Sequence, residues 1–236
     1  MKHEECLICG ALLEYLTEET EMTCALCHKT EGSKTRCKNG HYVCSACHTT
    51  GLGEAVFLCL KSESKDPLDI LIRLMEQPFC HMHGPEHHVL AGAALLTAFR
   101  NAGGAIDLSA ALGEMVRRGR EVPGGACGFW GACGAGISTG IFISIVTGAT
   151  PLDRANFALA HQMTARSLSA IGRAGGPRCC KRNSFLSVLE AVEFVQAHLG
   201  VRMESYTPRC RFSAYNGQCI GANCPFWHGD QKENEL

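Results

Sequence analysis

The middle of the chain carries the apolar spacing of amphipathic helices. After Asp66-Pro67, which is typical of an N-cap and a first-turn proline, the apolar residues Leu68, Leu71, Ile72 and Met75 fall on one face. The same period predicts further helices over 84–102, 106–120, from a start within 128–133 to 146, over 153–172, and from an Asn183 cap to Gly200. No alternating run in this part is long enough for a sheet, so the sequence predicts an all-α domain over residues 65–202 in a mainly α protein.

One stretch, residues 122–152, has no charge and is long enough to resemble a membrane span. It is rich in glycine, and Cys127 and Cys133 interrupt it. The small residues Ala132, Gly136 and Gly140 recur at every fourth position, which lets a neighbouring backbone approach closely. The pattern therefore favours a buried helix of a soluble domain and no association with a membrane.

Residues 1–60 show a different pattern, with short strand-like pieces at 11–16 and 21–23 on either side of a polar turn. Pairs of cysteines separated by two residues surround these pieces, and Gly10 allows the tight turn of a metal-binding knuckle. Two such pairs complete the tetrahedron that zinc prefers. The layout predicts a zinc-ribbon-like or RING-like module with two structural zinc sites, whose candidate ligands are Cys6, Cys9, Cys24, Cys27, Cys37, His41, Cys44 and Cys47.

The spacing leaves the pairing of these ligands open. Sequential pairing gives one four-cysteine site followed by a second site over 37–47, whereas crossed pairing interleaves the two. The segment 37–47 resembles the middle of RING-type fingers, although the terminal cysteine pair of a RING is missing. The module is interpreted either as a structural unit that zinc holds together or as an adaptor for a protein or nucleic acid.

Residues 206–230 contain a third set of ligands, Cys210, Cys219, Cys224 and His228, with the spacing of a CCCH-like finger that holds a third zinc ion. Phe212, Tyr215, Phe226 and Trp227 lie between these ligands, and Arg209 and Arg211 flank the first cysteine. The aromatic side chains either stack on unpaired RNA bases or form the miniature core of the finger.

The composition and the first residues indicate the cellular environment and the binding partners to expect. The chain has 16 cysteines among 236 residues and a formal net charge of −1. Residues 1–5 lead directly into the first knuckle without a basic and apolar leader, so a reducing, cytoplasmic location is expected, where cysteine pairs bind metals more often than they form disulfides. The balanced charge gives no general attraction to nucleic acid or to anionic membranes.

Three clusters in the central domain carry candidate chemistry. The first, at a helix start, contains His83, Glu86, His87 and His88, and its H-x-x-E-H order resembles that of inverted zinc peptidases, although Pro85 interrupts the motif. The second places Cys127 and Cys133 in a glycine-rich loop, and the third is Arg178-Cys179-Cys180-Lys181-Arg182. A helix start beside Cys133 and cations beside Cys179 and Cys180 are expected to lower thiol pKa values, and the three cations are candidate binders of an anionic substrate.

These clusters predict a metalloenzyme with a Cys/His pocket. The candidate catalytic residues are the four of the histidine cluster, which are expected to face Cys127, Cys133, Cys179 and Cys180. The cysteines either hold an iron–sulfur cluster with an open position or supply an activated thiolate. Sulfur-handling or redox chemistry on a small-molecule substrate would suit such a pocket. The alternatives are a non-catalytic zinc adaptor for RNA or a protein partner and a zinc hydrolase that uses His83, Glu86 and His87.

Several motifs occur together along the chain: the N-terminal knuckles, His83-Gly-Pro-Glu-His-His88, Cys127-Gly-Phe-Trp-Gly-Ala-Cys133-Gly, Gly-Gly-Pro-Arg178-Cys179-Cys180-Lys-Arg182 and Cys224-Pro-Phe. With this combination the chain resembles an uncharacterised bacterial and archaeal cysteine-rich family. This domain of unknown function is sometimes associated with S-adenosylmethionine-dependent methyltransferases. The resemblance implies the extent of the domain and no reaction, because the chain has no glycine-rich strand-loop-helix of its own for that cofactor. A shorter run, Cys133-Gly-Ala-Gly, is similar to helices of cysteine-rich redox proteins and iron–sulfur dehydratases.

Overall fold

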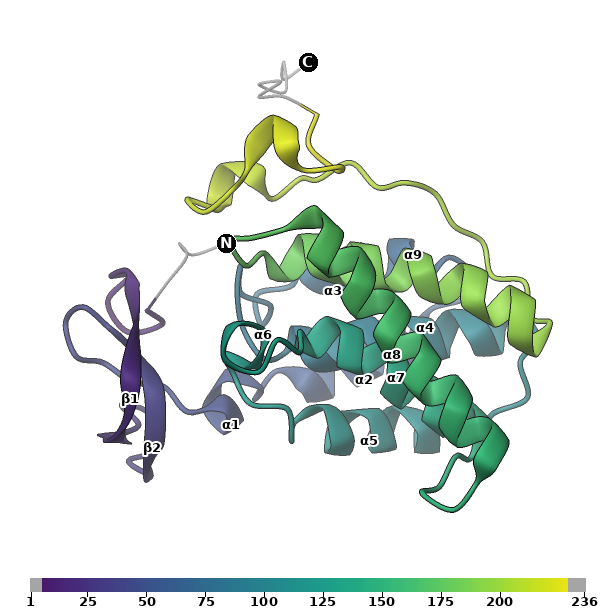
Figure 1. Ribbon diagram of the computed structural model, residues 1–236, viewed down its shortest axis with the longest axis horizontal. Helices are drawn as coiled ribbons and strands as arrows, with labels where there is room; N and C mark the ends of the chain where they lie inside the picture. The colour runs from purple at the N-terminus through teal and green to yellow at the C-terminus, as the bar shows by residue number, and fades with distance from the viewer. Residues whose placement is uncertain (1–5, 229–236) are drawn as a thin grey trace.

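The predicted helices of the central part are present in the computed structural model, which describes residues 6–228 (Figure 1). Positions 1–5 and 229–230 of the expected terminal modules lie outside the described residues. The helices are α2 (Leu52–Lys61), α3 (Pro67–Met75), α4 (His87–Asn101), α5 (Leu108–Gly119), α6 (Ala126–Phe129), α7 (Gly134–Thr147), α8 (Arg154–Ala174) and α9 (Cys180–Leu199).

Carboxylate side chains cap three of these helices, α3, α5 and α8, and the sequence predicts the first and the last of these caps. Asp66 accepts a hydrogen bond from the Leu68 amide at 2.8 Å, and Asp153 accepts one from the Asn156 amide at 3.0 Å. The predicted Asn183 cap is wrong, because α9 begins one turn earlier and the Cys179 sulfur accepts from the Arg182 amide at 3.4 Å. A capping rule based on Ser, Thr, Asn and Asp cannot identify a thiol in this position.

Helix α4 forms the centre of the core, since almost every residue from Val89 to Phe99 is buried, and it packs against α2, α3, α5, α7 and α9. The uncharged segment supplies α7, which lies against α8. A β-carbon at Gly140 would lie 1.9 Å from the Thr164 hydroxyl, so only glycine permits this approach of the two helices. Ala132 precedes the helix and does not share that contact. Among the described helices, none is both long and apolar enough to cross a membrane.

Helix α2 was not predicted. Its residues Leu52, Ala55 and Cys59 are buried and belong to the same hydrophobic cluster as α4. The helical core therefore includes residues that precede position 65.

The N-terminal part forms a two-stranded antiparallel sheet of β1 (Leu13–Thr23) and β2 (Thr30–Cys37), followed by the short helix α1 (Ser45–His48). The two predicted strand pieces belong to one continuous β1, whose pairing shifts register between Tyr15 and Thr20. Figure 1 shows the sheet beside the helical body, with α1 between them.

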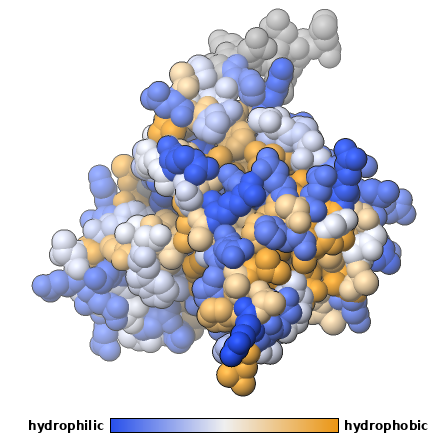
Figure 2. All heavy atoms as spheres, turned by 45° about the vertical axis from the view of Figure 1, so that its right-hand side comes forward, coloured by the Kyte–Doolittle hydropathy of each residue, from blue (hydrophilic) through white to orange (hydrophobic). Residues whose placement is uncertain are grey.

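The C-terminal segment leaves α9 at Gly200 and returns along the helical body in Figure 1 as two short 3₁₀ turns, η1 (Ser213–Tyr215) and η2 (Gly221–Asn223). Phe212 and Phe226 are each 1% exposed, and the Phe226 ring meets Phe185 of α9 edge-on at 5.4 Å. These two rings belong to the core and are not available to stack on RNA bases. Figure 2 shows hydrophobic side chains reaching the visible surface in patches between hydrophilic ones.

Candidate functional site

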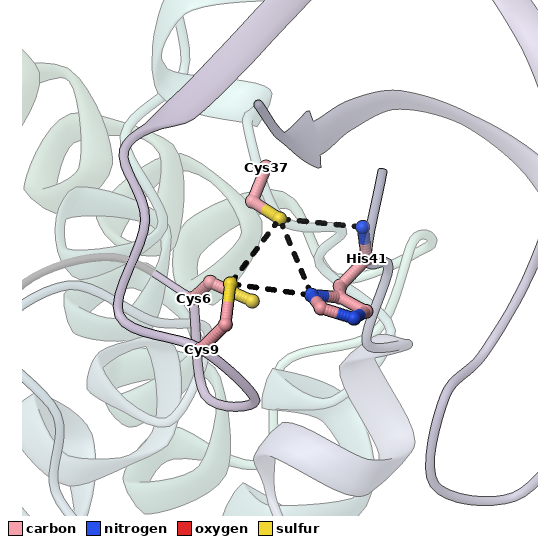
Figure 3. Close-up of side chains that lie close together, drawn as sticks. All are labelled: Cys6, Cys9, Cys37 and His41. Atoms are coloured by element: carbon pink, nitrogen blue, oxygen red, sulfur yellow. Dashed lines mark hydrogen bonds between the residues drawn. The ribbon is translucent and has the colours of Figure 1, made fainter. Parts of the chain in front are cut away.

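The N-terminal ligands converge in crossed order. Cys6 and Cys9 meet Cys37 and His41 (Figure 3), whereas Cys24 and Cys27 meet Cys44 and Cys47. The sheet explains this pairing, because its register sets Leu13 opposite Cys37 and thereby brings the first pair of cysteines to the end of β2. A backbone bridge between Cys24 and Tyr42 brings the second pair to the last one.

Both groups have the dimensions of a single-ion site. A tetrahedral zinc ion with bonds of about 2.3 Å to sulfur holds two sulfurs about 3.8 Å apart. The sulfur atoms lie 3.9 Å apart for Cys9 and Cys37, 3.8 Å for Cys24 and Cys47, and 3.6 Å for Cys27 and Cys44. The His41 Nδ1 atom lies 3.2 Å from the Cys9 sulfur. Each group can therefore hold one metal ion.

Hydrogen bonds to sulfur favour the thiolate in one member of each group. The Ala11 amide is the main cause that lowers the pKa of Cys9 to about 6. For Cys24, burial opposes ionisation, but the amides of Cys44, Cys27 and Leu26 lower its pKa to about 6. Metals bind thiolates, so each group presents a ligand that is already prepared for coordination.

A cleft of about 420 Å³ separates the N-terminal module from the helical body. Tyr15 and Arg36 of the sheet line one side, and the glycine-rich loop with Phe129 and Trp130 lines the other. The chemically interesting side chains of the lining are His48, His83, His88, Cys127, Arg178 and Cys180. The volume lies within the range of small-molecule sites.

Several polar atoms in this cleft are buried without a hydrogen-bond partner among residues 6–228. They are both ring nitrogens of His83, the Nδ1 atom of His48, and the Nε and Nη2 atoms of Arg178. An unsatisfied buried polar group costs about 1–3 kcal/mol. Three side chains from three segments carry this cost around one cavity, which is the arrangement expected where a polar ligand binds.

Glu86, which is 1% exposed, organises a buried network beside the cleft. Its Oε1 atom accepts a hydrogen bond from the His81 amide at 2.8 Å and lies 3.2 Å from the His81 Nδ1 atom and 3.7 Å from the Nδ1 atom of His87. Burial opposes ionisation, but the hydrogen bond from His81 lowers the pKa of Glu86 to about 2. The carboxylate is therefore ionised at neutral pH.

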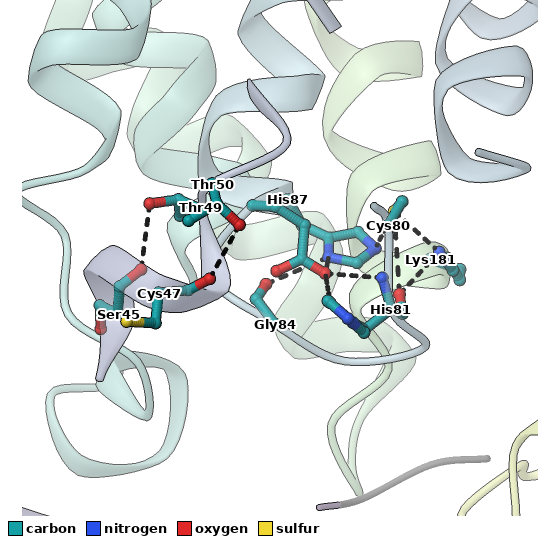
Figure 4. Close-up of polar contacts among 10 residues, drawn as sticks. Ser45, Cys47, Thr49, Thr50, Cys80, His81, Gly84, His87 and Lys181 are labelled. Atoms are coloured by element: carbon teal, nitrogen blue, oxygen red, sulfur yellow. Dashed lines mark hydrogen bonds and ion pairs between the residues drawn. The ribbon is translucent and has the colours of Figure 1, made fainter. Parts of the chain in front are cut away.

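Lys181 supplies the positive charge of this network. It is fully buried, and its ammonium group donates to the Cys80 sulfur at 3.1 Å and to the His81 carbonyl at 2.9 Å (Figure 4). Cys80, Glu86 and His87 lie close enough to hold a metal ion. Because an ammonium group already contacts the Cys80 sulfur, we interpret these residues as a hydrogen-bonded support for the histidine loop.

Burial keeps the histidines of this region neutral. It lowers the pKa of His83 to about 3, with Arg178 acting in the same direction, and it lowers the pKa of His87 well below its ordinary value, with Lys181 acting in the same direction. Burial also lowers the pKa values of His48 and His88. At neutral pH His83 can donate one hydrogen bond and accept another in the cleft.

Cys127 and Cys180 line the cleft, whereas Cys133 is not part of its lining. Cys127 is in α6, Cys133 is the N-cap of α7 and accepts from the Asn183 amide group at 3.4 Å, and Cys180 begins α9. Burial raises the pKa of Cys127, and the charge of Cys133 acts in the same direction. Burial likewise raises the pKa of Cys180 far above its ordinary value, despite Arg178.

The expectation that neighbouring cations activate Cys179 and Cys180 is therefore wrong. Burial raises the pKa of Cys179 as well, and it outweighs the favourable charge of Arg182. Lys181 and Arg182 also do not line the cleft. The Nη2 atom of Arg182 donates to the carbonyls of Gly175 at 2.6 Å and Pro177 at 2.9 Å, so only Arg178 of the three predicted cations faces a substrate in the cleft.

Two predicted ligand sets do not assemble in the described part of the chain. His83 and His87 share no metal-sized group, so the peptidase-like order of residues does not produce a peptidase-like site. Cys210, Cys219 and Cys224 do not form such a group with His228. Instead, these three cysteines and Cys179 line a separate small cavity from which His228 is absent.

Sequence reasoning missed His48 and did not select His81, and it assigned Lys181 to an anionic substrate and not to the buried network. His48 directly follows the last zinc-type knuckle, and α1 carries it to a position where it forms a group with His81 and Glu86. His81 belongs to the histidine-rich run at 81–88, and the number of histidines in that run was the signal in the sequence for its role. Nothing in the sequence indicated that Lys181 would be buried.

Comparison with known proteins identifies one family. Residues 56–227 match the model of a protein family whose description gives no function. No curated protein and no solved structure matches the chain. The family match covers the helical body and the C-terminal segment, and it begins after the two metal-binding groups of the N-terminal module.

Proposed function

The chain belongs to DUF5714, a family of unknown function, and we propose that it is a metalloenzyme that binds a small anionic molecule in the cleft. Cys127, Cys133 and Cys180 would hold an iron–sulfur centre, which would supply the redox or Lewis-acid chemistry. The N-terminal module holds two structural zinc ions and forms one wall of the cleft. The observation that carries the proposal is the set of buried, unpartnered polar atoms of His48, His83 and Arg178 around one cavity.

Arg178 defines the ligand class. Its guanidinium group is held 5.3 Å from the Tyr15 ring centre, and its Nε and Nη2 atoms have no acceptor among residues 6–228. A guanidinium group in this state matches a carboxylate or a phosphate, which can accept two parallel hydrogen bonds. His83 lies in the same cavity and donates a further hydrogen bond to the anion or to a group attached to it.

The three thiols favour a metal centre over a free nucleophile. Their raised pKa values leave Cys127 and Cys180 as neutral thiols in the protein alone, and a neutral thiol is a poor nucleophile. The charges of Cys133 and Arg178 act on both residues. Three cysteine ligands would leave one position of such a centre for a substrate, and the centre would supply Lewis-acid or redox chemistry there.

The chain's own residues then have separate tasks. Arg178 binds and orients the anion, and neutral His83 holds or accepts a proton at its ring nitrogen once the anion is bound. Glu86 and Lys181 keep the loop that carries His83 in place. Small-molecule redox or sulfur-handling chemistry suits this combination.

The first test is anaerobic purification of the full-length protein, followed by measurement of iron, acid-labile sulfide, zinc and the visible spectrum. Cys133→Ser should lose iron and sulfide and keep zinc. Cys59→Ala is the matched control, because Cys59 is also buried but lies in the hydrophobic core outside the cleft. Equal iron and sulfide in these two variants would remove the proposed centre.

The second test measures binding of inorganic phosphate and malonate by calorimetry. Arg178→Gln should weaken binding of at least one anion by tenfold or more, whereas Arg173→Gln, at an exposed arginine of α8, should not. Unchanged binding in Arg178→Gln would show that the cleft does not select anions through this residue.

A binding role without catalysis is the competing proposal. It rests on Phe129 and Trp130, which are 45% and 65% exposed at the rim of the cleft, and on Lys34 above the Phe129 ring at 5.5 Å. A salt-dependent gel shift of single-stranded RNA that is lost in Trp130→Ala would favour this adaptor role.

A further inference from the structure

The C-terminal segment brings three cysteines to the start of α9. A small cavity is lined by four cysteines, Cys179, Cys210, Cys219 and Cys224. We call these four residues the quartet. The rest of the wall is mainly apolar and includes Phe185, Phe212 and Phe226. Because the Cys210 amide donates to the Phe226 carbonyl at 2.8 Å and Phe226 packs on Phe185, the segment is fixed to the helix that Cys179 caps.

Hydrogen-bond donors point at the sulfurs of this cavity. The Cys179 sulfur accepts from the Arg182 amide at 3.4 Å and from the Asn216 side-chain amide at 3.5 Å. The Cys210 sulfur accepts from the Phe212 amide and the Cys219 sulfur from the Gly221 amide, both at 3.4 Å. Neutral thiols are weak acceptors, so donors to three of four sulfurs are typical of a site built for thiolates.

The spacing of the quartet differs from that of the N-terminal groups. There, all ligand atoms lie within 4.8 Å of one another, as around a single zinc ion. Within residues 6–228, no three quartet sulfurs meet that limit, although all four residues border one cavity. Thiolates that bind different iron atoms of a cluster are farther apart than thiolates around a single ion.

We propose that Cys179, Cys210, Cys219 and Cys224 hold a closed iron–sulfur cluster, separate from the centre at Cys127, Cys133 and Cys180. His228 is not a ligand of this cluster. The neighbouring residues Cys179 and Cys180 then serve two different centres, one on each side of the start of α9. The cluster also fastens the C-terminal segment to the helix that carries Lys181, whose ammonium group lies 4.9 Å from the Phe212 ring centre.

The test compares iron, sulfide and zinc in the anaerobically purified full-length protein with those in Cys219→Ser and His228→Ala. Cys219 is the exposed member of the quartet, so its substitution disturbs the apolar wall least. We expect Cys219→Ser to lose about half of the iron and sulfide, while His228→Ala keeps the wild-type content. Wild-type iron in Cys219→Ser would overturn the inference, as would loss of zinc in place of iron or an equal loss of metal in His228→Ala.

A second measurement needs no variant. Brief alkylation with iodoacetamide, followed by peptide mass spectrometry, should leave Cys219 unmodified in the anaerobic protein and modify it rapidly after iron has been removed with a chelator. Rapid modification of exposed Cys219 in the iron-containing protein would overturn the inference. The outcomes also separate the two proposals: if only the quartet holds iron, Cys219→Ser loses all of it and Cys133→Ser loses none.

Discussion

Replacing Glu86 by glutamine tests the account of the buried network directly. Glutamine has almost the same size and can still accept a hydrogen bond from the His81 amide, which lies 2.8 Å from the Glu86 Oε1 atom. It cannot carry the negative charge. The substitution therefore removes the charge-dependent part of the hydrogen bonds between Glu86 and His81.

The magnitude follows from the pKa of Glu86, which falls from an ordinary value of 4.5 to about 2. A tenfold change in this equilibrium corresponds to about 1.4 kcal/mol, so the ionised carboxylate stabilises the folded state by about 3 kcal/mol. Since the pKa is lower in the folded state, this contribution is fully present above pH 4.5. It is lost as the pH falls through about 2.

Urea unfolding followed by far-ultraviolet circular dichroism at pH 7 measures this difference. Glu86→Gln should lower the free energy of unfolding by about 3 kcal/mol. Glu114→Gln is the control, because Glu114 pairs with Arg117 and Arg118 in contact with solvent, where water screens the interaction.

A loss below about 1 kcal/mol in Glu86→Gln, or a loss no larger than that of Glu114→Gln, would refute the reasoning. It would mean that the carboxylate is protonated in the folded protein or that water reaches it. The same experiment at pH 5 should give the same difference between wild type and Glu86→Gln, because the carboxylate is still ionised there in both states.

Three further predictions follow from the same structure. Gly84→Ala should destabilise the protein by about 2–4 kcal/mol, because its β-carbon would lie 2.0 Å from the Glu86 Oε2 atom, whereas Gly53→Ala, with open space around it, should cost less. The pKa of His83 falls from 6.5 to about 3 on folding, so acid favours the unfolded state below pH 6.5; His83→Gln should reduce the loss of stability between pH 7 and pH 5 by about 2 kcal/mol, and an unchanged pH dependence would contradict this. In zinc analysis, the double variant Cys9→Ser/Cys37→Ser should lose about one ion and Cys9→Ser/Cys44→Ser about two, whereas sequential pairing predicts two ions for the first variant.

Much of the local structure could be predicted from the sequence. The Asp66 and Asp153 caps and the apolar periods identified the helices because a helix depends on residues that are three or four positions apart. The cysteine knuckles identified the N-terminal ligands for the same reason, since two thiols with two residues between them share one turn. Helix α2 escaped prediction because its buried face became evident only through its contacts with the helical core.

The grouping of the ligands could not be predicted, because it depends on contacts between distant parts of the chain. The crossed pairing at Cys37 and Cys44 results from the register of the sheet and the bridge to Tyr42. The position of Cys179 beside Cys210, Cys219 and Cys224 results from the return of the C-terminal segment along α9. The exclusion of His228 from that cavity has the same origin.

The sequence by itself determined which residues have metal-binding and acid–base chemistry and which segments are helical, because both properties belong to side chains and their near neighbours. The tertiary structure decided which of these residues share a site. It also decided their ionisation: cations near Cys180 in the sequence suggested a thiolate, but burial made the thiol neutral. Desolvation depends on everything that packs around a group, and only the folded chain defines those surroundings.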